Sequence, residues 1–208
     1  TVVNLAIAND WMHKNPFAGI RFQEKEVIRE VLTKEEIERM MCKEFALPRL
    51  EYVRDVFIFC VFTGMAYVDV NNLRQEHIVR DNNDDLWIRK ARQKTNNMCN
   101  IPLLKIPQLL MEKYKNHPLC TKTGALLPVP SNQKMNSYLK EIADFCGIQK
   151  NLTTHTARHT FATVVALANG VSMENIAKML GHSDIRMTQR YAKVMDSSIM
   201  RDMENVDK

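Results

Sequence analysis

The sequence predicts a mostly α-helical fold with a small three-stranded antiparallel sheet. Most of the 208 residues fall in segments where apolar residues return at helical spacing behind Ser or Thr caps. Residues 77–103 instead hold short alternating runs separated by polar turns, which indicates strands. A chain of this length can bury one substantial core.

The elements follow in order. Residues 1 to about 20 resemble the last helix of a different module, ending at Asn15-Pro16 because proline cannot continue a helix, and a charged connector follows. Thr33 and Glu36 form a capping box that opens the next helix. Further helices are predicted at 52–62, 106–116, 132–146, 155–169, 173–180 and 184–194, and strands at 77–80, 86–92 and 98–103. Residues 196–208 form either a final helix or a frayed end.

His155 and Arg158 stand three residues apart at the start of one predicted helix, where Thr153 or Thr154 supplies the cap. At this spacing the two side chains share a face beside free backbone N–H groups and the positive end of the helix dipole. An anionic phosphate is favoured there, and a guanidinium adds two parallel hydrogen bonds. Taken alone, H-x-x-R can also be an ordinary charged helix face.

A helix joint follows Gly170. Ser172 starts one helix, Gly181 ends it in a left-handed cap, and Ser183 caps the next. This geometry puts His182 on the turn and Tyr191 about two helical turns further along.

The three motifs H-x-x-R, L-G-H-S and T-x-x-Y, in this order, resemble the catalytic domain of the tyrosine recombinase (phage integrase) family. They stand here at 155–158, 180–183 and 188–191. The resemblance implies a site-specific DNA recombinase in which Tyr191 attacks a phosphodiester and forms a 3′-phosphotyrosine linkage. Arg158 and His182 would hold the phosphate oxygens, and His155 is the candidate base. No metal, ATP or other cofactor is implied, because the cations are side chains.

The resemblance continues upstream with one departure. FIFCVFTGMAYVDVNNLRQEHI is similar to the family's T-G-L-R-x-x-E-L stretch, with Asp69 at the acidic position, but Ala66 occupies the place of the first catalytic arginine. Members of the family from conjugative transposons also lack that arginine. Arg92 and Arg54 are the candidates to replace it, and Asp69 would orient the replacement. Each could instead be a surface arginine paired with a carboxylate, as Glu51 would serve for Arg54.

The family's catalytic lysine lies on a β-hairpin, which implies Lys94 here, as the acid that protonates the departing 5′ oxygen. Strand alternation puts Arg92 on the same face as Lys94. Lys90 has the same parity and is the alternative lysine.

The resemblance also implies an organisation and partners. Residues 1–24 would be the end of a core-binding domain and its linker, and residues 25–208 the catalytic domain with a C-terminal tail. The partner would be double-stranded DNA, bound by a homo-tetramer with or without accessory DNA-bending proteins. The reaction would integrate and excise a mobile element, with Ala66 pointing to a conjugative transposon.

Two other functions stay open. A catalytically impaired relative would bind DNA without forming a covalent adduct, and Ala66 motivates that alternative. A transcription regulator would use residues 174–190 as a helix-turn-helix, but that hypothesis leaves His155, Arg158 and Tyr191 without a role.

Composition agrees with the resemblance. A formal net charge of +5, spread along the chain, suits a phosphate-rich partner held on a folded face. Five scattered cysteines without a C-x-x-C pair argue against a disulfide framework or a zinc site and favour the cytoplasm. No apolar run reaches the length of a membrane span, and the first residues lack the pattern of a signal peptide.

Overall fold

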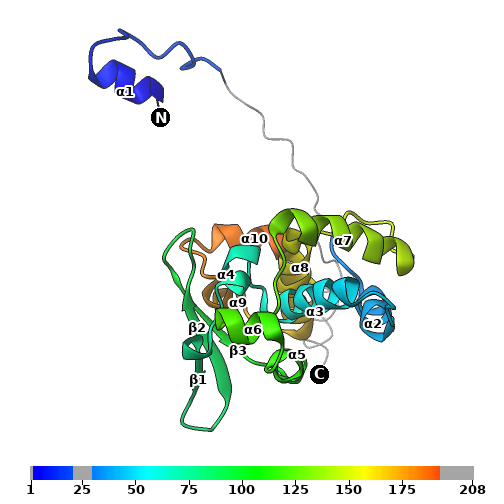
Figure 1. Cartoon of the computed structure of the whole chain (residues 1–208). Helices are drawn as coiled ribbons and strands as arrows, with labels where there is room; N and C mark the ends of the chain where they lie inside the picture. The colour runs from blue at the N-terminus through cyan, green and yellow to red at the C-terminus, as the bar shows by residue number, and fades with distance from the viewer. Residues whose placement is uncertain (1, 21–29, 193–208) are drawn as a thin grey trace, which may run out of the picture.

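A computed structural model describes residues 2–20 and 30–192. Figure 1 shows the strands at one edge of a body of helices, with α3 near the middle of that body. The helices are α1 Val2–Ala8, α2 Lys34–Cys42, α3 Pro48–Thr63, α4 Tyr67–Asn71, α5 Lys105–Tyr114, α6 Pro118–Thr123, α7 Asn132–Phe145, α8 Thr154–Thr160, α9 Met173–Leu180 and α10 Arg186–Ala192, with short 3-10 turns at Gln75–His77 and Leu167–Asn169 and a π-helical segment at Phe161–Ala166.

The three predicted strands are confirmed to within one residue at each end. β1 (Ile78–Arg80), β2 (Leu86–Ala91) and β3 (Met98–Pro102) form an antiparallel sheet in the order β1-β2-β3. Ile88 pairs with Ile101, and both side chains are buried on the face that joins the core. Lys90 pairs with Cys99 on that same face, so the sheet carries a lysine towards the helices as well as apolar residues.

Helix α3 organises the core. Its first two turns are polar and partly exposed, but residues 55–61 are all buried, as expected for the apolar part of a central helix. It contacts α2, α5, α7 and α8. Phe57 and Phe59 are fully buried, and each such side chain contributes about 2 kcal/mol to stability. The helix is longer than the predicted 52–62 because Pro48 is well suited to the first helical position, where no N–H is needed.

Gly64 ends α3 in the left-handed conformation, with φ of 67°. Its N–H donates to the carbonyl oxygen of Cys60 at 2.8 Å. A Cβ at this position would overlap the ring of Phe161 and a methyl group of Leu180. The turn therefore requires glycine twice, for its backbone angle and for the close packing of α3 against the C-terminal helices.

The capping box predicted at the start of α2 is confirmed. The Thr33 hydroxyl accepts the N–H of Glu36 at 3.2 Å, and the Glu36 carboxylate accepts the N–H of Thr33 at 2.8 Å.

The first helix is shorter than predicted. It ends at Ala8 rather than at Asn15, because Asp10 adopts φ of 54° and the N–H of Trp11 turns back to the carbonyl oxygen of Ala6 at 2.9 Å. This is a helix-ending motif usually built on glycine, and aspartate tolerates the same conformation.

The predicted helix at 155–169 is one helical run of changing geometry. It is α-helical through Thr160, π-helical over Phe161–Ala166 and 3-10 over Leu167–Asn169. Such π segments are frequent at functional sites, and this one begins three residues after Arg158. Two short helices, α4 and α6, were not predicted.

Two further expectations concern the C-terminal end. Ser183 does not start α10: the carboxylate of Asp184 accepts the N–H of Arg186 at 2.9 Å, and the helix begins at Arg186. The predicted final helix at 196–208 lies outside the described residues.

Among residues 2–20 and 30–192, no helix is both long and apolar enough to cross a membrane.

Candidate active site

The site begins at α8. The structure selects Thr153 as its cap: the Thr153 hydroxyl accepts the N–H of Thr156 at 3.3 Å, and the Thr156 hydroxyl accepts the N–H of Thr153 at 3.2 Å. His155 lies exposed in the first turn. Arg158 lies one turn deeper, with 7% of its surface exposed. The two residues thus share a helix, but only the arginine enters the interior.

Arg158 is held by the ends of two other helices. Its Nη1 donates to the carbonyl oxygen of Gly64 at 2.6 Å, just after α3, and its Nη2 donates to that of Leu180 at 2.6 Å, the last residue of α9. Carbonyls at helix C-termini lack partners within their helix and carry partial negative charge. The Arg158 guanidinium is therefore solvated by dipoles, and no carboxylate among residues 2–20 and 30–192 is bonded to it. Burial and then the nearby Arg92 lower the pKa of Arg158.

His182 is placed by the end of α9. Gly181 has φ of 61°, its N–H donates to Lys178, and the N–H of His182 donates to the carbonyl oxygen of Ala177 at 2.9 Å. This confirms the predicted left-handed cap, and it fixes the backbone of His182 one residue beyond the turn.

The His182 ring contacts two side chains. Its Nε2 lies 3.2 Å from Nη2 of Arg158, and its Nδ1 lies 2.9 Å from the hydroxyl of Thr188. Burial, followed by the charges of Arg158 and Arg92, lowers the pKa of His182 to about 4. The imidazole is therefore neutral at physiological pH.

Tyr191 lies on α10, next to these groups. Its ring is 8% exposed and packs in a small apolar cluster with Phe161 and Leu180. The ring stacks on His182 with centroids 6.2 Å apart, and it meets His159 at 5.2 Å. Burial and the charge of Arg92 lower the pKa of Arg158, whereas a negative charge on the Tyr191 oxygen would raise it. The phenol oxygen thus lies within electrostatic reach of that guanidinium.

Arg92 reaches the same place from the β2–β3 hairpin. Its Nε lies 3.8 Å from a carboxylate oxygen of Asp69, is buried, and makes no hydrogen bond to the described residues. The other Asp69 oxygen accepts the N–H of Gln93 at 2.9 Å, which ties α4 to the hairpin. After burial, the Arg92 charge is among the causes that lower the pKa of both Arg158 and His182. We call Arg92, Arg158, His182 and Tyr191 the Arg158 cluster.

The remaining positions from the motifs lie around this cluster. Ala66 immediately precedes α4, two residues after the Gly64 turn. Lys94 lies exposed in the turn of the hairpin, two residues beyond Arg92. Lys90 is half-buried on β2, opposite Cys99. The structure thus brings Arg92 to the Arg158 cluster, while Lys94 stands on the exposed turn.

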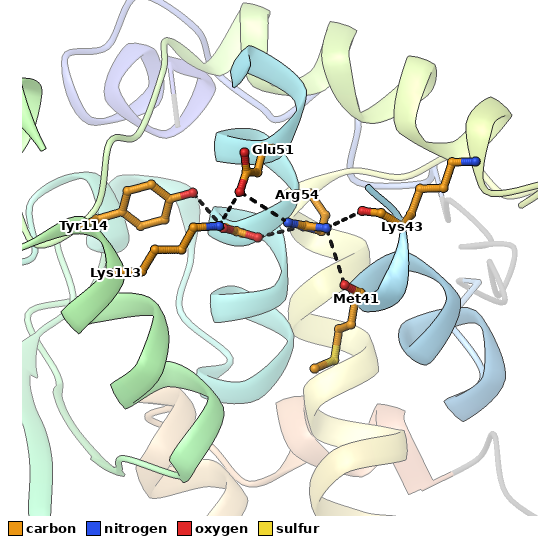
Figure 2. Close-up of polar contacts among 7 residues, drawn as sticks. Met41, Lys43, Glu51, Arg54, Lys113 and Tyr114 are labelled. Atoms are coloured by element: carbon orange, nitrogen blue, oxygen red, sulfur yellow. Dashed lines mark hydrogen bonds and ion pairs between the residues drawn. The ribbon is translucent and has the colours of Figure 1, made fainter. Parts of the chain in front are cut away.

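Arg54 lies in a different group, which Figure 2 shows. Its Nε donates to Asp55 at 2.7 Å, and its Nη1 donates to the backbone carbonyl oxygens of Met41 and Lys43 at the C-terminal end of α2. Asp55 also accepts hydrogen bonds from Lys113 at 2.7 Å and from the Tyr114 hydroxyl at 2.6 Å. The guanidinium of Arg54 is thus held by the carboxylate of Asp55 on α3 and by carbonyls at the end of α2, so the structure does not bring it to the Arg158 cluster. The members of this Arg54 cluster are Glu51, Arg54, Asp55, Lys113 and Tyr114.

Two residues of the site were not predicted. Thr188 is 1% exposed and contacts the His182 ring, and His159 lies against Tyr191. Thr188 stands in the T-x-x-Y motif, so its spacing of three from Tyr191 was a usable signal: on a helix, the two side chains share a face. Within the described ranges, no three His, Cys, Asp or Glu side chains are grouped to hold a metal ion.

Comparison with known protein families gives one match over most of the chain. The model of the family described as "Phage integrase family" matches residues 30–198. Tyrosine recombinase XerD of Staphylococcus saprophyticus subsp. saprophyticus is 40% identical over 95 residues, which are 46% of this chain and 31% of that protein. XerD of Staphylococcus epidermidis is 38% identical over 95 residues, with the same coverage of 46% and 31%. The chain thus spans about a third of the length of these relatives.

Solved structures share the fold. A lambda integrase dimer bound to a COC′ core site has a TM-score of 0.68 at 19% identity, covering 90% of this chain and 68% of that one. The Tn1549 transposon integrase in complex with a circular intermediate DNA has a TM-score of 0.67 at 18% identity, covering 97% and 74%. At these identities the similarity is one of fold.

Proposed function

This chain belongs to the phage integrase family, and from that premise we propose that it cuts and rejoins DNA at a specific site through a covalent 3′-phosphotyrosine intermediate. One observation carries the proposal. The Arg158 guanidinium is buried among helix-end carbonyls, beside a neutral imidazole and the Tyr191 phenol, and in the described part of the chain no carboxylate is bonded to it. Such a group stabilises an anion that arrives from outside.

In the proposed reaction the Tyr191 oxygen attacks the phosphorus, and its proton passes to a base, for which His155 is the candidate. The bond from phosphorus to the 5′ oxygen breaks, and Lys94 donates the proton that this oxygen needs to leave as a hydroxyl. Arg158 and His182 hold the non-bridging oxygens while negative charge builds on them. Because the phosphodiester energy stays in the phosphotyrosine, another 5′ hydroxyl can reverse the step without ATP or metal.

Arg92 supplies the cation that is missing at Ala66. Its position beside Arg158 and Asp69 supports this, and so does its buried Nε, which has no hydrogen-bond acceptor among the described residues. Burying an N–H donor without an acceptor costs about 1–3 kcal/mol, which a phosphate oxygen would recover. Arg54 is not carried into the proposal, because carboxylates and carbonyls already hold it.

The proposed substrate is double-stranded DNA of a mobile element, bound by a tetramer, in the cytoplasm, with accessory bending proteins where the site requires them. The Tn1549 transposon integrase among the structural neighbours supports the mobile element, and the DNA-bound lambda integrase supports the partner. We further propose that residues 1–24 are the end of a core-binding domain and its linker, and that residues 25–208 are the catalytic domain with its C-terminal tail. The apolar side chains exposed on this segment, such as Trp11 at 77%, support a covering module.

The decisive experiment uses the full protein and nicked DNA duplexes, selected for binding from a random-sequence pool, in which a nick traps the cleaved strand. We expect a covalent protein–DNA complex that is lost in Tyr191→Phe and kept in Tyr138→Phe, the matched control, whose ring lies on α7 against Arg49 and has no part in the proposed reaction. Retained DNA binding with no adduct at any salt concentration would contradict the proposal. It would favour the alternative of a DNA-binding relative impaired by Ala66.

The role of Arg92 has its own test. Arg92→Gln should lose cleavage by about 100-fold while keeping DNA binding, as expected when one cation of the transition state is removed. Arg89→Gln, on the opposite and exposed face of the same strand, should cleave normally. Equal cleavage by the two variants would remove Arg92 from the mechanism.

A further inference from the structure

Both ring nitrogens of His182 have a partner, and together these partners fix where its proton resides. Nε2 lies 3.2 Å from Nη2 of Arg158, and Nδ1 lies 2.9 Å from the Thr188 hydroxyl. A guanidinium has only donors, so Nε2 must present its lone pair to Arg158. The single proton of the neutral ring then sits on Nδ1 and is donated to the oxygen of Thr188.

This tautomer is the wrong one for the role assigned to His182 in the proposed reaction. Without a proton on Nε2, the ring cannot donate from that atom to a phosphate oxygen. In the protein without DNA the lone pair of Nε2 instead serves as an acceptor for Arg158. A change of tautomer is therefore required between the free protein and the DNA complex.

Thr188 is suited to permit that change. Its side chain is 1% exposed, and its backbone N–H donates to the carbonyl oxygen of Ile185 at 2.8 Å, so the residue is fixed at the start of α10. A hydroxyl can accept a hydrogen bond in one rotation and donate one in another. It can therefore satisfy Nδ1 whether or not that nitrogen carries a proton. A carboxylate could only accept, and a valine could do neither.

We propose that Thr188 is a positioning residue that, together with Arg158, sets the tautomer of His182 in the free protein and permits its reversal when DNA binds. This rests on the proposed function. When a phosphate oxygen accepts the hydrogen bond that Nη2 of Arg158 had donated to His182, Nε2 of His182 is left without a donor. The ring then gives its Nδ1 proton to water and takes one from water at Nε2, so its charge does not change. Thr188 rotates to donate to Nδ1, and Nε2–H donates to the phosphate.

The same hydroxyl links the histidine to the nucleophile. Thr188 and Tyr191 stand three apart on α10, on one face of the helix, and the Tyr191 ring stacks on His182. The contact from Thr188 to Nδ1 therefore holds the helix that carries Tyr191 against the ring that would hold the phosphate. Positioning of the phenol and of the donor depends on one side chain.

The test is ¹⁵N–¹H correlation spectroscopy of the full protein with labelled histidine, in which the two ring nitrogens report the tautomer directly. The chain has six histidines, so the His182→Gln spectrum identifies the signal. We expect Nδ1–H in the free protein at pH 7, and Nε2–H after addition of the nicked duplex to the Tyr191→Phe variant. Nε2–H or imidazolium in the free protein would overturn the proposal, as would an unchanged tautomer with DNA bound.

Variants of Thr188 add a readout of activity. Thr188→Val should mix the tautomers and slow cleavage about tenfold, the worth of one hydrogen bond, at unchanged DNA affinity, and Thr188→Ser should restore both. Thr163→Val, the same change at a buried threonine that donates to a backbone carbonyl, is the control and should keep both. A tautomer unaffected by Thr188→Val would refute the inference.

The spectra test the tautomer proposal and the covalent adduct tests the proposed function, so either proposal can be contradicted without the other. A wild-type protein that shows the expected tautomer but forms no adduct would contradict the proposed function and leave the free-state assignment standing. An adduct formed by a protein whose free state shows Nε2–H would support the proposed function and contradict the tautomer assignment. If Thr188→Val does not fold, the wild-type and Thr188→Ser spectra still decide.

Discussion

The Arg54 cluster and the Arg158 cluster both hold a largely buried arginine next to α3, but the charge of that arginine is compensated differently in the two. In the Arg54 cluster, Asp55 is hydrogen-bonded to Arg54 and Lys113, and Glu51 lies beside both. Hydrogen bonds to these carboxylates outweigh burial and raise the pKa of Lys113. In the Arg158 cluster, the partners of Arg158 are two carbonyls and a neutral imidazole, and Asp69 is 3.8 Å from Arg92.

The comparison shows how to tell a structural cation from one that awaits an anion. A guanidinium paired with a carboxylate has its charge compensated, and another anion gains little from approaching it. Helix-end carbonyls satisfy the same hydrogen bonds but carry only a fraction of a negative charge. The Arg158 cluster therefore keeps a positive potential that the Arg54 cluster lacks, and the four predictions below test this difference.

The largest effect is expected at Arg158. Arg158→Gln should slow single-turnover cleavage of the nicked duplex about 10²- to 10³-fold, because a donor to the charged transition state is lost. Its unfolding free energy should also fall by about 2 kcal/mol, because the carbonyls of Gly64 and Leu180 lose their donor. Arg54→Gln, the matched control, should lose stability alone. Equal loss of cleavage per folded molecule in both would erase the distinction.

Next comes Asp55. Asp55→Asn should lower the unfolding free energy measured in urea by about 3 kcal/mol. The cost arises because Arg54 and Lys113 lose the negative charge that both now pair with. Cleavage per folded molecule should not change. Glu51→Gln, at a more exposed position, should cost about 1 kcal/mol or less because solvent screens it. A fall in cleavage for Asp55→Asn would show that this cluster takes part in the reaction.

A smaller effect is expected at Gly181. An added Cβ would come within 2.7 Å of Arg92 Cδ and of Cys99 Sγ. Gly181→Ala should therefore lose about 1–2 kcal/mol of stability to left-handed strain and slow cleavage further by moving Arg92. Gly147→Ala has nearly the same strain, with φ of 63°, but its nearest neighbour is 3.7 Å away. Calorimetry should find Gly181→Ala more destabilised than Gly147→Ala, because only the first adds a clash to the strain, and only Gly181→Ala should slow cleavage per folded molecule.

The last prediction, which has no effect at neutral pH, is a pH dependence of stability. The pKa of His182 is about 4 in the folded protein and about 6.5 in an unfolded chain. Between these values the unfolded state binds more protons, so stability is lost as pH falls from about 6.5 through about 4. Urea unfolding at a series of pH values should show this slope, and His182→Gln should flatten it. An unchanged slope in the variant would mean that His182 does not titrate in this range.

Local patterns in the sequence predicted much of this arrangement. The three strands, the capping box at Thr33 and the left-handed turn at Gly181 all depend on residues close together in the chain, and all are confirmed. The early end of the first helix gave no such signal, because an aspartate, Asp10, takes the place of the usual glycine.

What the sequence could not predict depends on contacts between distant residues. Arg54 was a reasonable candidate beside the Thr63-Gly64 turn, but the carbonyls of Met41 and Lys43 and the carboxylate of Asp55 hold it elsewhere. Arg92 was predicted from strand parity, yet its approach to Arg158 depends on how the hairpin packs under Gly181. Whether Lys94 reaches the phosphate stays a prediction.

Arg158 joins the ends of α3 and α9, and this constrains how the chain can change over evolutionary time. A mutation at this position would weaken the scaffold together with the chemistry, so selection for a folded protein alone would tend to retain it. Within the described part of the chain, position 66 has no comparable link, because Ala66 precedes a short helix and makes no side-chain hydrogen bond to it. Loss of a cation by drift is therefore easier at position 66 than at Arg158, and an inactive descendant would still carry the buried arginine.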